Sequence, residues 1–168
     1  VVNGIFVNQG HVCCAGSRLL VEESVAERVL DKLKARMRTL RVGNPLDKNT
    51  DIGAINSTAE LEKIRRLVET GKQEGARYYE PENVSLPTKG NFLRPCLFSD
   101  VASSHTICRV EVFGPVLAMS TFRTPAEAIA KANDTPYGLA AGIWSEKGSK
   151  VHAVAAQLRA GVIWANTY

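Results

Sequence analysis

The sequence lacks the features of a membrane-spanning or disulfide-stabilised protein. No part of its 168 residues approaches the roughly 18 consecutive apolar residues that a membrane span needs, so we expect no membrane partner. Only four cysteines are present, and they stand at positions 13, 14, 96 and 108. This spacing forms neither a disulfide framework nor a C-x-x-C metal pair. We therefore expect a reducing, cytoplasmic setting.

Two kinds of binding motif are also absent. The sequence has no phosphate-binding glycine loop of the G-x-G-x-x-G or G-x-x-x-x-G-K type, so no loop motif within this chain predicts nucleotide binding. Its three histidines, His11, His105 and His152, are not spaced as metal ligands. We predict no metal site.

Neither sign of charge strongly dominates the sequence. The 21 basic and 17 acidic residues leave a formal net charge of +4, with an isoelectric point near 9.0, which is a mild excess and not the concentrated positive field of a nucleic-acid binder. The bases from Lys32 to Arg41 alternate faces of a predicted helix without interleaved aromatic residues, as is typical of a solvated surface. The alternative, a phosphate-binding stripe, would show strongly salt-dependent affinity. We expect no nucleic-acid partner.

What is present is the composition of one globular domain. Hydrophobic residues make up 45% and charged residues 23% of the chain, and the length fits a single domain over residues 1–168. The chain opens inside an apolar run at Val1 and stops at Tyr168 without a polar tail, so we expect a segment of a longer protein.

Predicted strands and helices alternate along the chain. Short apolar runs predict strands over residues 18–22, 77–79, 91–98, 115–122, 139–144 and 162–166. Helical spacing and capping residues predict helices that begin at Ser24, Ser57 and Thr124 and one that contains Val151, with Gly71 and Gly75 ending the second and Gly161 ending the last. Helices between strands indicate β-α-β crossovers, so we predict an α/β fold with a mostly parallel sheet covered on both faces.

The adjacent thiols of Cys13 and Cys14 are the most reactive side chains that the sequence offers. They follow Gly10 and precede small residues that could begin a short helix. A helix N-terminus would lower the pKa of a thiol, and its N–H groups could hold an oxyanion. Spacing alone favours two inert buried cysteines, because unpaired cysteine is among the most buried residue types.

Two sequence blocks resemble signatures of one enzyme superfamily. The first, residues 6–13, is similar to the F-x-x-x-G-[QE]-x-C signature, with Phe6, Gly10 and Cys13 in place. The second, residues 111–116, is similar to E-[IV]-F-G-P-V. Further collinear stretches lie at 42–45, 51–53, 133–139 and 161–166. Over nearly its whole length the chain resembles the NAD(P)-dependent aldehyde dehydrogenase superfamily, and specifically its catalytic, thiol-bearing domain, which is a three-layer, Rossmann-like fold.

The resemblance implies a role for each matching residue. Cys13 would be the nucleophile that attacks the aldehyde carbonyl, giving a thiohemiacetal and then a thioester, and its backbone N–H would help to hold the oxyanion. Glu111 would hydrogen-bond a ribose hydroxyl of NAD or NADP, and Phe113 would pack beside the nicotinamide. Lys63 lies near the family's cofactor-ribose contacts. Without the resemblance, Glu111 would be a surface carboxylate before a Gly-Pro turn and Phe113 an ordinary core side chain.

The sequence also departs from the family's pattern. His11 stands where the signature has Gln or Glu, and Val110 stands where many members have an acid. The family's main cofactor-binding domain, its general-base Glu and its Asn oxyanion donor precede a segment like this one, and its oligomerisation arm follows it. We therefore expect the rest of a longer, homo-oligomeric parent enzyme to be the chain's partner, and the isolated chain to be inactive. The alternative is an aldehyde-dehydrogenase-like scaffold without catalysis.

Overall fold

The chain folds into two β-sheets with helices packed against them, and the computed structural model describes residues 1–167. In chain order the elements are α1 (Val2–Phe6), the 3-10 helix η1 (Val7–Gly10), β1 (Arg18–Glu22), the 3-10 helix η2 (Glu23–Val25), α2 (Ala26–Met37), α3 (Thr58–Gln73), β2 (Arg77–Tyr79), β3 (Cys96–Ser99), α4 (Thr106–Arg109), β4 (Val116–Phe122), α5 (Pro125–Asn133), β5 (Ala140–Ile143), α6 (Gly148–Ala155) and β6 (Val162–Ala165).

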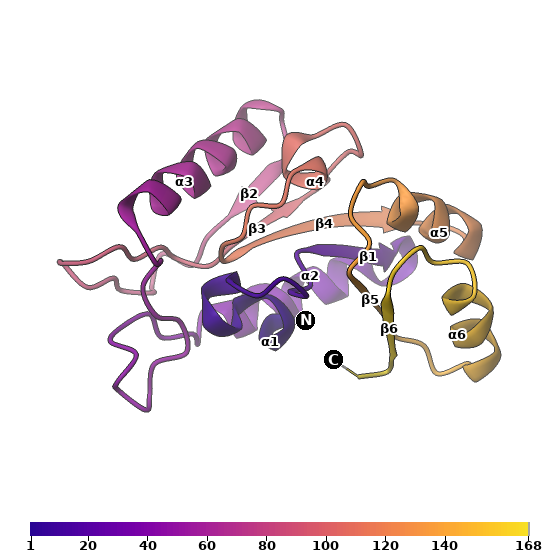
Figure 1. Ribbon diagram of the computed structural model, residues 1–168, viewed down its shortest axis with the longest axis horizontal. Coiled ribbons are helices and arrows are strands. Elements are labelled where there is room, and N and C mark those ends of the chain that lie inside the picture. Colours follow the sequence, from indigo (N-terminus) through magenta and orange to yellow (C-terminus); the bar gives the residue numbers. More distant parts are fainter. Residues whose placement is uncertain (168) are drawn as a thin grey trace.

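The larger sheet has the strand order β1-β4-β3-β2 (Figure 1). Its inner strand β4 pairs in parallel with both β1 and β3, and the short edge strand β2 pairs antiparallel with β3. Strands β5 and β6 form a second, two-stranded parallel sheet. The prediction of a mostly parallel α/β arrangement is confirmed, although the strands divide between two sheets.

Helices cover both faces of the larger sheet. In β3, Leu97 packs into a cluster with side chains of α1 and α2, whereas Cys96 and Phe98 pack into a second cluster with side chains of α3 and α4. Leu117 and Ala118 of β4 divide in the same way, because successive side chains of a strand point to opposite faces. Figure 1 shows α3 on one side of the sheet and α1 and α2 on the other. The fold therefore has three layers, helix on sheet on helix.

The predicted helix starts are confirmed where capping residues mark them. The Ser57 hydroxyl accepts a hydrogen bond from the N–H of Glu60 at 3.1 Å, and the Thr124 hydroxyl accepts one from the N–H of Glu127 at 3.2 Å. Pro125 fills the first position of α5, where no N–H is needed. These caps satisfy N–H groups that have no partner within their own helix.

The structure confirms one predicted helix end and corrects two others. Gly75 follows the C-cap Glu74 of α3 with φ +90°, and its N–H donates to the carbonyl of Lys72 at 3.1 Å, so this glycine ends the helix as predicted. Helix α3 runs through Gly71, because this glycine lets α4 approach: a Cβ there would lie 2.8 Å from the side chain of Ile107. Helix α6 ends at Ala155, well before Gly161, whose N–H instead donates to the carbonyl of Gly138 at 2.8 Å. At Gly71 and Gly161, therefore, glycine serves a close approach between segments and not a helix terminus.

Candidate functional site

Cys13 lies in a tight turn that follows two short helices. The turn is closed by a hydrogen bond from the N–H of Ala15 to the carbonyl of Val12, at 2.9 Å. Its far side is tied back to α1, because the N–H of Gly16 donates to the carbonyl of Gly4, also at 2.9 Å. The turn is thereby held between α1 and the start of β1.

The expectation of a helix beginning at the thiols was wrong. Residues 13 and 14 form a turn, and the next regular element is the strand β1. The helical turns α1 and η1 precede Cys13 instead, and the chain after it extends into the sheet. The side chain of Cys13 is exposed and that of Cys14 is half-buried. The alternative of a thiol sealed in the core therefore does not describe Cys13.

The two signature blocks, about a hundred residues apart in sequence, meet directly. Gly10 has φ +75°, and a Cβ placed on it would lie 2.1 Å from the carbonyl oxygen of Gly114. Beside this contact, the ring of His11 meets the ring of Phe113 edge-on, with centroids 5.3 Å apart. Phe113 itself has φ +56°, a left-handed conformation that non-glycine residues adopt at a cost. The fold thus joins the segment that carries Cys13 to the segment that carries Glu111 and Phe113.

Glu111 is exposed, and a third matching stretch holds its backbone. The N–H of Glu111 donates to the hydroxyl of Tyr137 at 3.2 Å. Just before it, the Arg109 guanidinium pairs with Asp134 at 3.0 Å. Two residues of the 133–139 stretch therefore contact the segment that leads into the second signature block.

Helix α4 ends two residues before Glu111. The first residue of this helix is bound by Glu74, which lies at the end of α3. The carboxylate of Glu74 accepts hydrogen bonds from the N–H of Thr106 at 2.7 Å and from its hydroxyl at 2.6 Å. The hydroxyl bond lowers the pKa of Glu74 below its ordinary value, and desolvation opposes this shift only in part. This pair fastens α4 to the helical layer.

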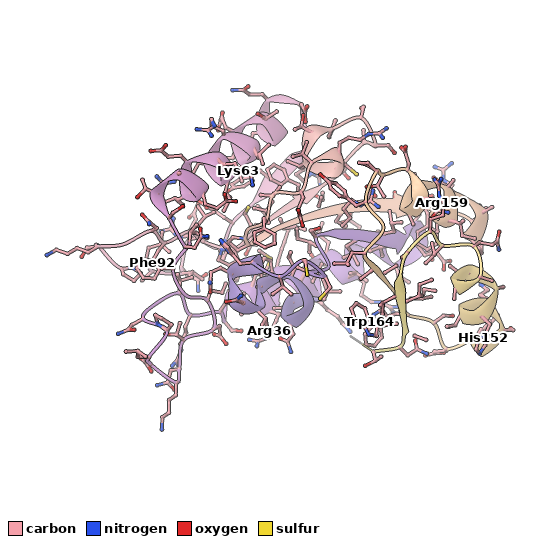
Figure 2. The ribbon with its side chains drawn as sticks, viewed as in Figure 1. Arg36, Lys63, Phe92, His152, Arg159 and Trp164 are labelled. Carbon is pink, nitrogen blue, oxygen red and sulfur yellow. The ribbon has the colours of Figure 1, made fainter. Side chains whose placement is uncertain are left out.

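Lys63 takes no part in these contacts. It projects from α3 (Figure 2), and its Nζ pairs with Glu60 of the same helix at 2.9 Å. The next residue, Ile64, is the one that meets the second block: a Cβ on Gly114 would lie 2.7 Å from the Ile64 side chain. Helix α3 therefore supports the site through Ile64, while the role of Lys63 toward a cofactor stays a prediction.

His11 has an unsatisfied ring nitrogen. Its Nδ1 lies 3.4 Å from the carbonyl oxygen of Gln9, whereas its Nε2 is buried and makes no hydrogen bond within residues 1–167. A buried polar nitrogen without a partner is costly. The ring of His11 thus packs against that of Phe113, and its Nε2 adds no hydrogen bond to another described residue.

A contrasting thiol lies in the core. Cys96 is buried in β3, and this burial, together with the negative charge of Glu80, raises its pKa to about 12. Its neighbour Tyr78, whose pKa burial also raises, donates a hydrogen bond to Glu80 at 2.9 Å. Cys96 is therefore an inert structural thiol, and the most exposed sulfur of the four is that of Cys13.

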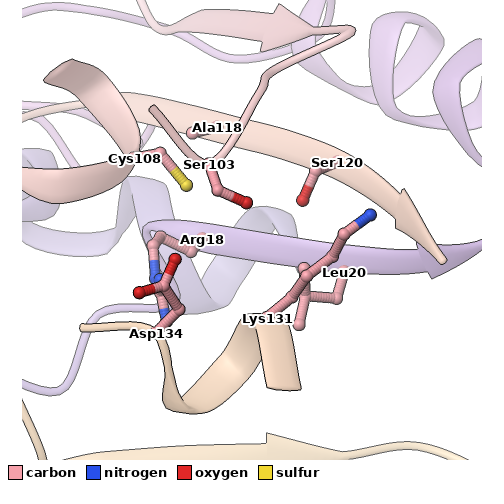
Figure 3. A pocket seen from close by; sticks show the side chains of 8 residues that line it. All are labelled: Arg18, Leu20, Ser103, Cys108, Ala118, Ser120, Lys131 and Asp134. Carbon is pink, nitrogen blue, oxygen red and sulfur yellow. The ribbon is translucent and has the colours of Figure 1, made fainter. Parts of the chain in front are cut away.

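Two hollows lie away from the signature blocks. A cavity of about 10 Å³ lies between β1, β4 and α5, and the thiol of Cys108 and the hydroxyls of Ser103 and Ser120 point into it (Figure 3). A more open hollow of about 580 Å³ adjoins the edge strand β2 around Tyr79. Neither is lined by Cys13 or Glu111.

Two kinds of feature are absent from residues 1–167, a metal-ligating cluster and a membrane-spanning helix. No three His, Cys, Asp or Glu side chains gather there in a group that could hold a metal ion. Every helix in this range is too short or too polar to cross a bilayer. Figure 2 shows His152 on α6, at the right of the view and away from Lys63 on α3.

Sequence reasoning missed two side chains that build the site. Gln9 accepts a hydrogen bond from the N–H of Gly53 at 3.0 Å, which ties the first block to another matching stretch. Tyr137 supports the backbone of Glu111. Both residues fall inside segments that matched the family, but sequence periodicity carries no information on which distant backbone group a side chain reaches.

The exposed groups of the second block fit one half of a nicotinamide dinucleotide. The Glu111 carboxylate is free to accept hydrogen bonds from ribose hydroxyls, and the half-buried ring of Phe113 offers an apolar edge to a flat heterocycle. The sequence offers no glycine loop for the pyrophosphate. The residues present thus suit a contribution to cofactor binding and not a complete cofactor site.

Known proteins of one family resemble this chain over nearly its whole length. The model of the aldehyde dehydrogenase family matches residues 1–168. The betaine aldehyde dehydrogenase of Sinorhizobium fredii is 37% identical over 167 residues, which make up 98% of this chain and 34% of that protein. The aminoaldehyde dehydrogenase 2 of Zea mays is 39% identical over 164 residues, which cover 97% of this chain and 32% of that protein.

Solved structures show the same relationship. The indole-3-acetaldehyde dehydrogenase AldA of P. syringae, solved in complex with NAD+, superposes with a TM-score of 0.94 at 42% identity. HpcC of Thermus thermophilus also superposes with a TM-score of 0.94, at 37% identity. Each match covers 99% of this chain and 34% of the other. The chain spans about a third of the length of these relatives, and it belongs to the aldehyde dehydrogenase family.

Proposed function

We propose that residues 1–168 of this chain form the thiol-bearing catalytic domain of an NAD(P)-dependent aldehyde dehydrogenase. In this proposal the domain is part of a longer, homo-oligomeric and cytoplasmic enzyme. The observation that carries the proposal is the junction of the two signature blocks at Gly10 and Gly114, which brings the exposed thiol of Cys13 into the same region as Phe113. The relatives that it matches along a third of their length are named as aldehyde dehydrogenases.

In this proposal Cys13 performs the covalent chemistry. Its thiolate adds to the carbonyl carbon of the aldehyde to form a thiohemiacetal, with the oxyanion accepting a hydrogen bond from the Cys13 backbone N–H. Bound NAD or NADP supplies the acceptor for the hydride that leaves this carbon. The resulting thioester is hydrolysed by water to the carboxylic acid, which returns the thiol. A thiolate suits both steps, because it is nucleophilic near neutral pH and leaves readily from a thioester.

Glu111 and Phe113 have binding roles in the proposal. The Glu111 carboxylate accepts hydrogen bonds from the ribose next to the nicotinamide, and Phe113 packs beside the ring. Lys63 is a further contact on the ribose side, through N–H groups of its ammonium that do not donate to Glu60. The pyrophosphate and the general base are supplied by parts of the longer enzyme.

The deciding experiment is substitution of each adjacent thiol in the longer enzyme. We expect Cys13→Ala to lower aldehyde-dependent NADH formation by at least 10³-fold, because the covalent path is lost. The matched variant Cys14→Ala should retain most of the activity. An active Cys13→Ala enzyme would overturn the proposal, and an enzyme inactive before any substitution would favour the scaffold. The isolated chain should form no NADH, because one missing oxyanion donor and a missing general base together cost at least about 10⁴ in rate.

A further inference from the structure

The residues before Cys13 form a left-handed turn in which Gln9 is the residue least suited to that conformation. Asn8 has φ 52° and ψ 39°, Gln9 has φ 53° and ψ 22°, and Gly10 has φ 75°. Glycine adopts this conformation freely and asparagine tolerates it, but it is costly for Gln9, whose Cβ lies close to a carbonyl oxygen. Such a conformation persists only where surrounding contacts enforce it.

Hydrogen bonds within the turn close it but do not fix it in the fold. The N–H of His11 donates to the carbonyl of Asn8 at 2.9 Å, and the side-chain amide of Asn8 donates to the carbonyl of His11 at 3.1 Å. The side-chain amide of Gln9 donates to the side-chain oxygen of Asn8 at 3.3 Å. All of these partners lie within residues 8–11, so the turn could move as a unit without breaking them.

Gln9 supplies the hydrogen bond that reaches outside the turn. Its Oε1 accepts from the N–H of Gly53, 44 residues further along the chain, at 3.0 Å. Gly53 is buried, and a Cβ on it would lie 3.1 Å from this same oxygen. On the other side, Gly10 packs against the carbonyl of Gly114. The turn is therefore anchored at two points, three to four residues before Cys13.

We propose that Gln9 is a positioning residue for Cys13: its hydrogen bond to the N–H of Gly53 holds the left-handed turn that sets where the thiol lies relative to the second signature block. This inference rests on the proposed function. A reacting sulfur must approach the carbonyl carbon within a narrow range of distance and angle, so freeing one anchor lowers the rate of the chemical step more than it weakens substrate binding.

Two substitutions of Gln9 distinguish the effect of its hydrogen-bond acceptor from the effect of the rest of its side chain. Gln9→Glu keeps an oxygen that can accept from Gly53, whereas Gln9→Met keeps the length and flexibility of the side chain but has no such acceptor. In the isolated chain, Gln9→Met should speed hydrogen exchange of the Gly53 N–H at least tenfold, and Gln9→Glu should leave it near the wild-type rate. If Gln9→Met does not fold, Gly53→Ala disturbs the same bond from its other end.

In the longer enzyme, Gln9→Met should lower kcat at least tenfold with the aldehyde KM within twofold of wild type. The separate variant Gln9→Glu should keep kcat near the wild-type value. Unchanged kcat in Gln9→Met, or a parallel change in kcat and KM that Gln9→Glu does not rescue, would overturn the role of Gln9. Activity that survives Cys13→Ala would overturn the proposed function and this role together. An inactive Cys13→Ala enzyme with a fully active Gln9→Met enzyme would overturn the role of Gln9 alone.

Discussion

The carbonyl oxygen of Gly114 occupies the space where any side chain at Gly10 would begin. A Cβ there would lie 2.1 Å from this oxygen and 3.2 Å from the carbonyl of Ile5. Both neighbours are backbone atoms, so neither can rotate away. The joint between the Cys13 segment and the second signature block thus depends on the absence of a single methyl group.

The first prediction concerns this joint. Gly10→Ala should destabilise the chain by about 2–4 kcal/mol, because alanine is strained at φ +75° and its methyl group overlaps the backbone of Gly114. Urea unfolding followed by circular dichroism measures the change in the free energy of unfolding.

Gly148→Ala is the matched control, since a Cβ at that position meets no atom within 4 Å and Gly148 begins α6. It should be neutral or slightly stabilising, because alanine favours a helix more than glycine does. Equal losses in the two variants would contradict the close approach of Gly10 and Gly114.

The contrast between prediction and structure around Cys13 has a physical explanation. Helix starts at Ser57 and Thr124 were predictable because capping is local, with donor and acceptor three residues apart. The turn at Cys13 was not, because its shape depends on contacts with Gly53 and Gly114, far away in sequence. Matching motifs indicated that these segments belong to one site, and only the fold shows which backbone groups join them.

The second prediction concerns Tyr137, whose hydroxyl accepts from the N–H of Glu111 at 3.2 Å. Tyr137→Phe removes this acceptor alone. Because Glu111 is exposed, water can replace the lost partner, and the global stability should fall by no more than about 1 kcal/mol. Hydrogen exchange of the Glu111 N–H should become several-fold faster, as NMR can measure.

In the longer enzyme, the same Tyr137→Phe variant should weaken NAD binding several-fold if Glu111 contacts the cofactor. The matched variant Tyr79→Phe removes the hydroxyl of a residue in β2. It should leave the hydrogen exchange of the Glu111 N–H unchanged. Exchange of Glu111 that Tyr137→Phe does not alter would show that this hydrogen bond contributes nothing to the segment.

The third prediction follows from the lowered pKa of Glu74, which the Thr106 hydroxyl causes. A carboxyl whose pKa is lower in the folded chain stabilises the fold above its unfolded value of 4.5, and this contribution is lost as the pH falls through the folded pKa. Glu74→Gln should therefore reduce the loss of stability on acidification below pH 4.5. Urea unfolding at several pH values measures this dependence.

Thr106→Val tests the cause of that shift, because valine has the shape of threonine but cannot donate to Glu74. It should reduce the acid dependence in the same direction, and the double variant Glu74→Gln/Thr106→Val should show little further change, since both substitutions remove one interaction. Fully additive effects would mean that Thr106→Val changes the acid dependence through a group other than Glu74.

The fourth prediction compares the exposed and buried thiols. Burial and the charge of Glu80 raise the pKa of Cys96 to about 12, so its thiol stays protonated near neutral pH, and the buried side chain is also closed to reagents. Iodoacetamide should therefore modify Cys13 in the folded chain while Cys96 stays unmodified, as peptide mass spectrometry can follow. In urea all four cysteines should react at similar rates, and Cys13→Ser identifies the first peptide to be labelled.

Near pH 7, Cys13 should also react before the half-buried Cys108. Labelling of Cys96 at the rate of Cys13 without urea would contradict the burial of β3, and labelling of Cys108 ahead of Cys13 would count against the proposed reactivity of Cys13 and favour the scaffold.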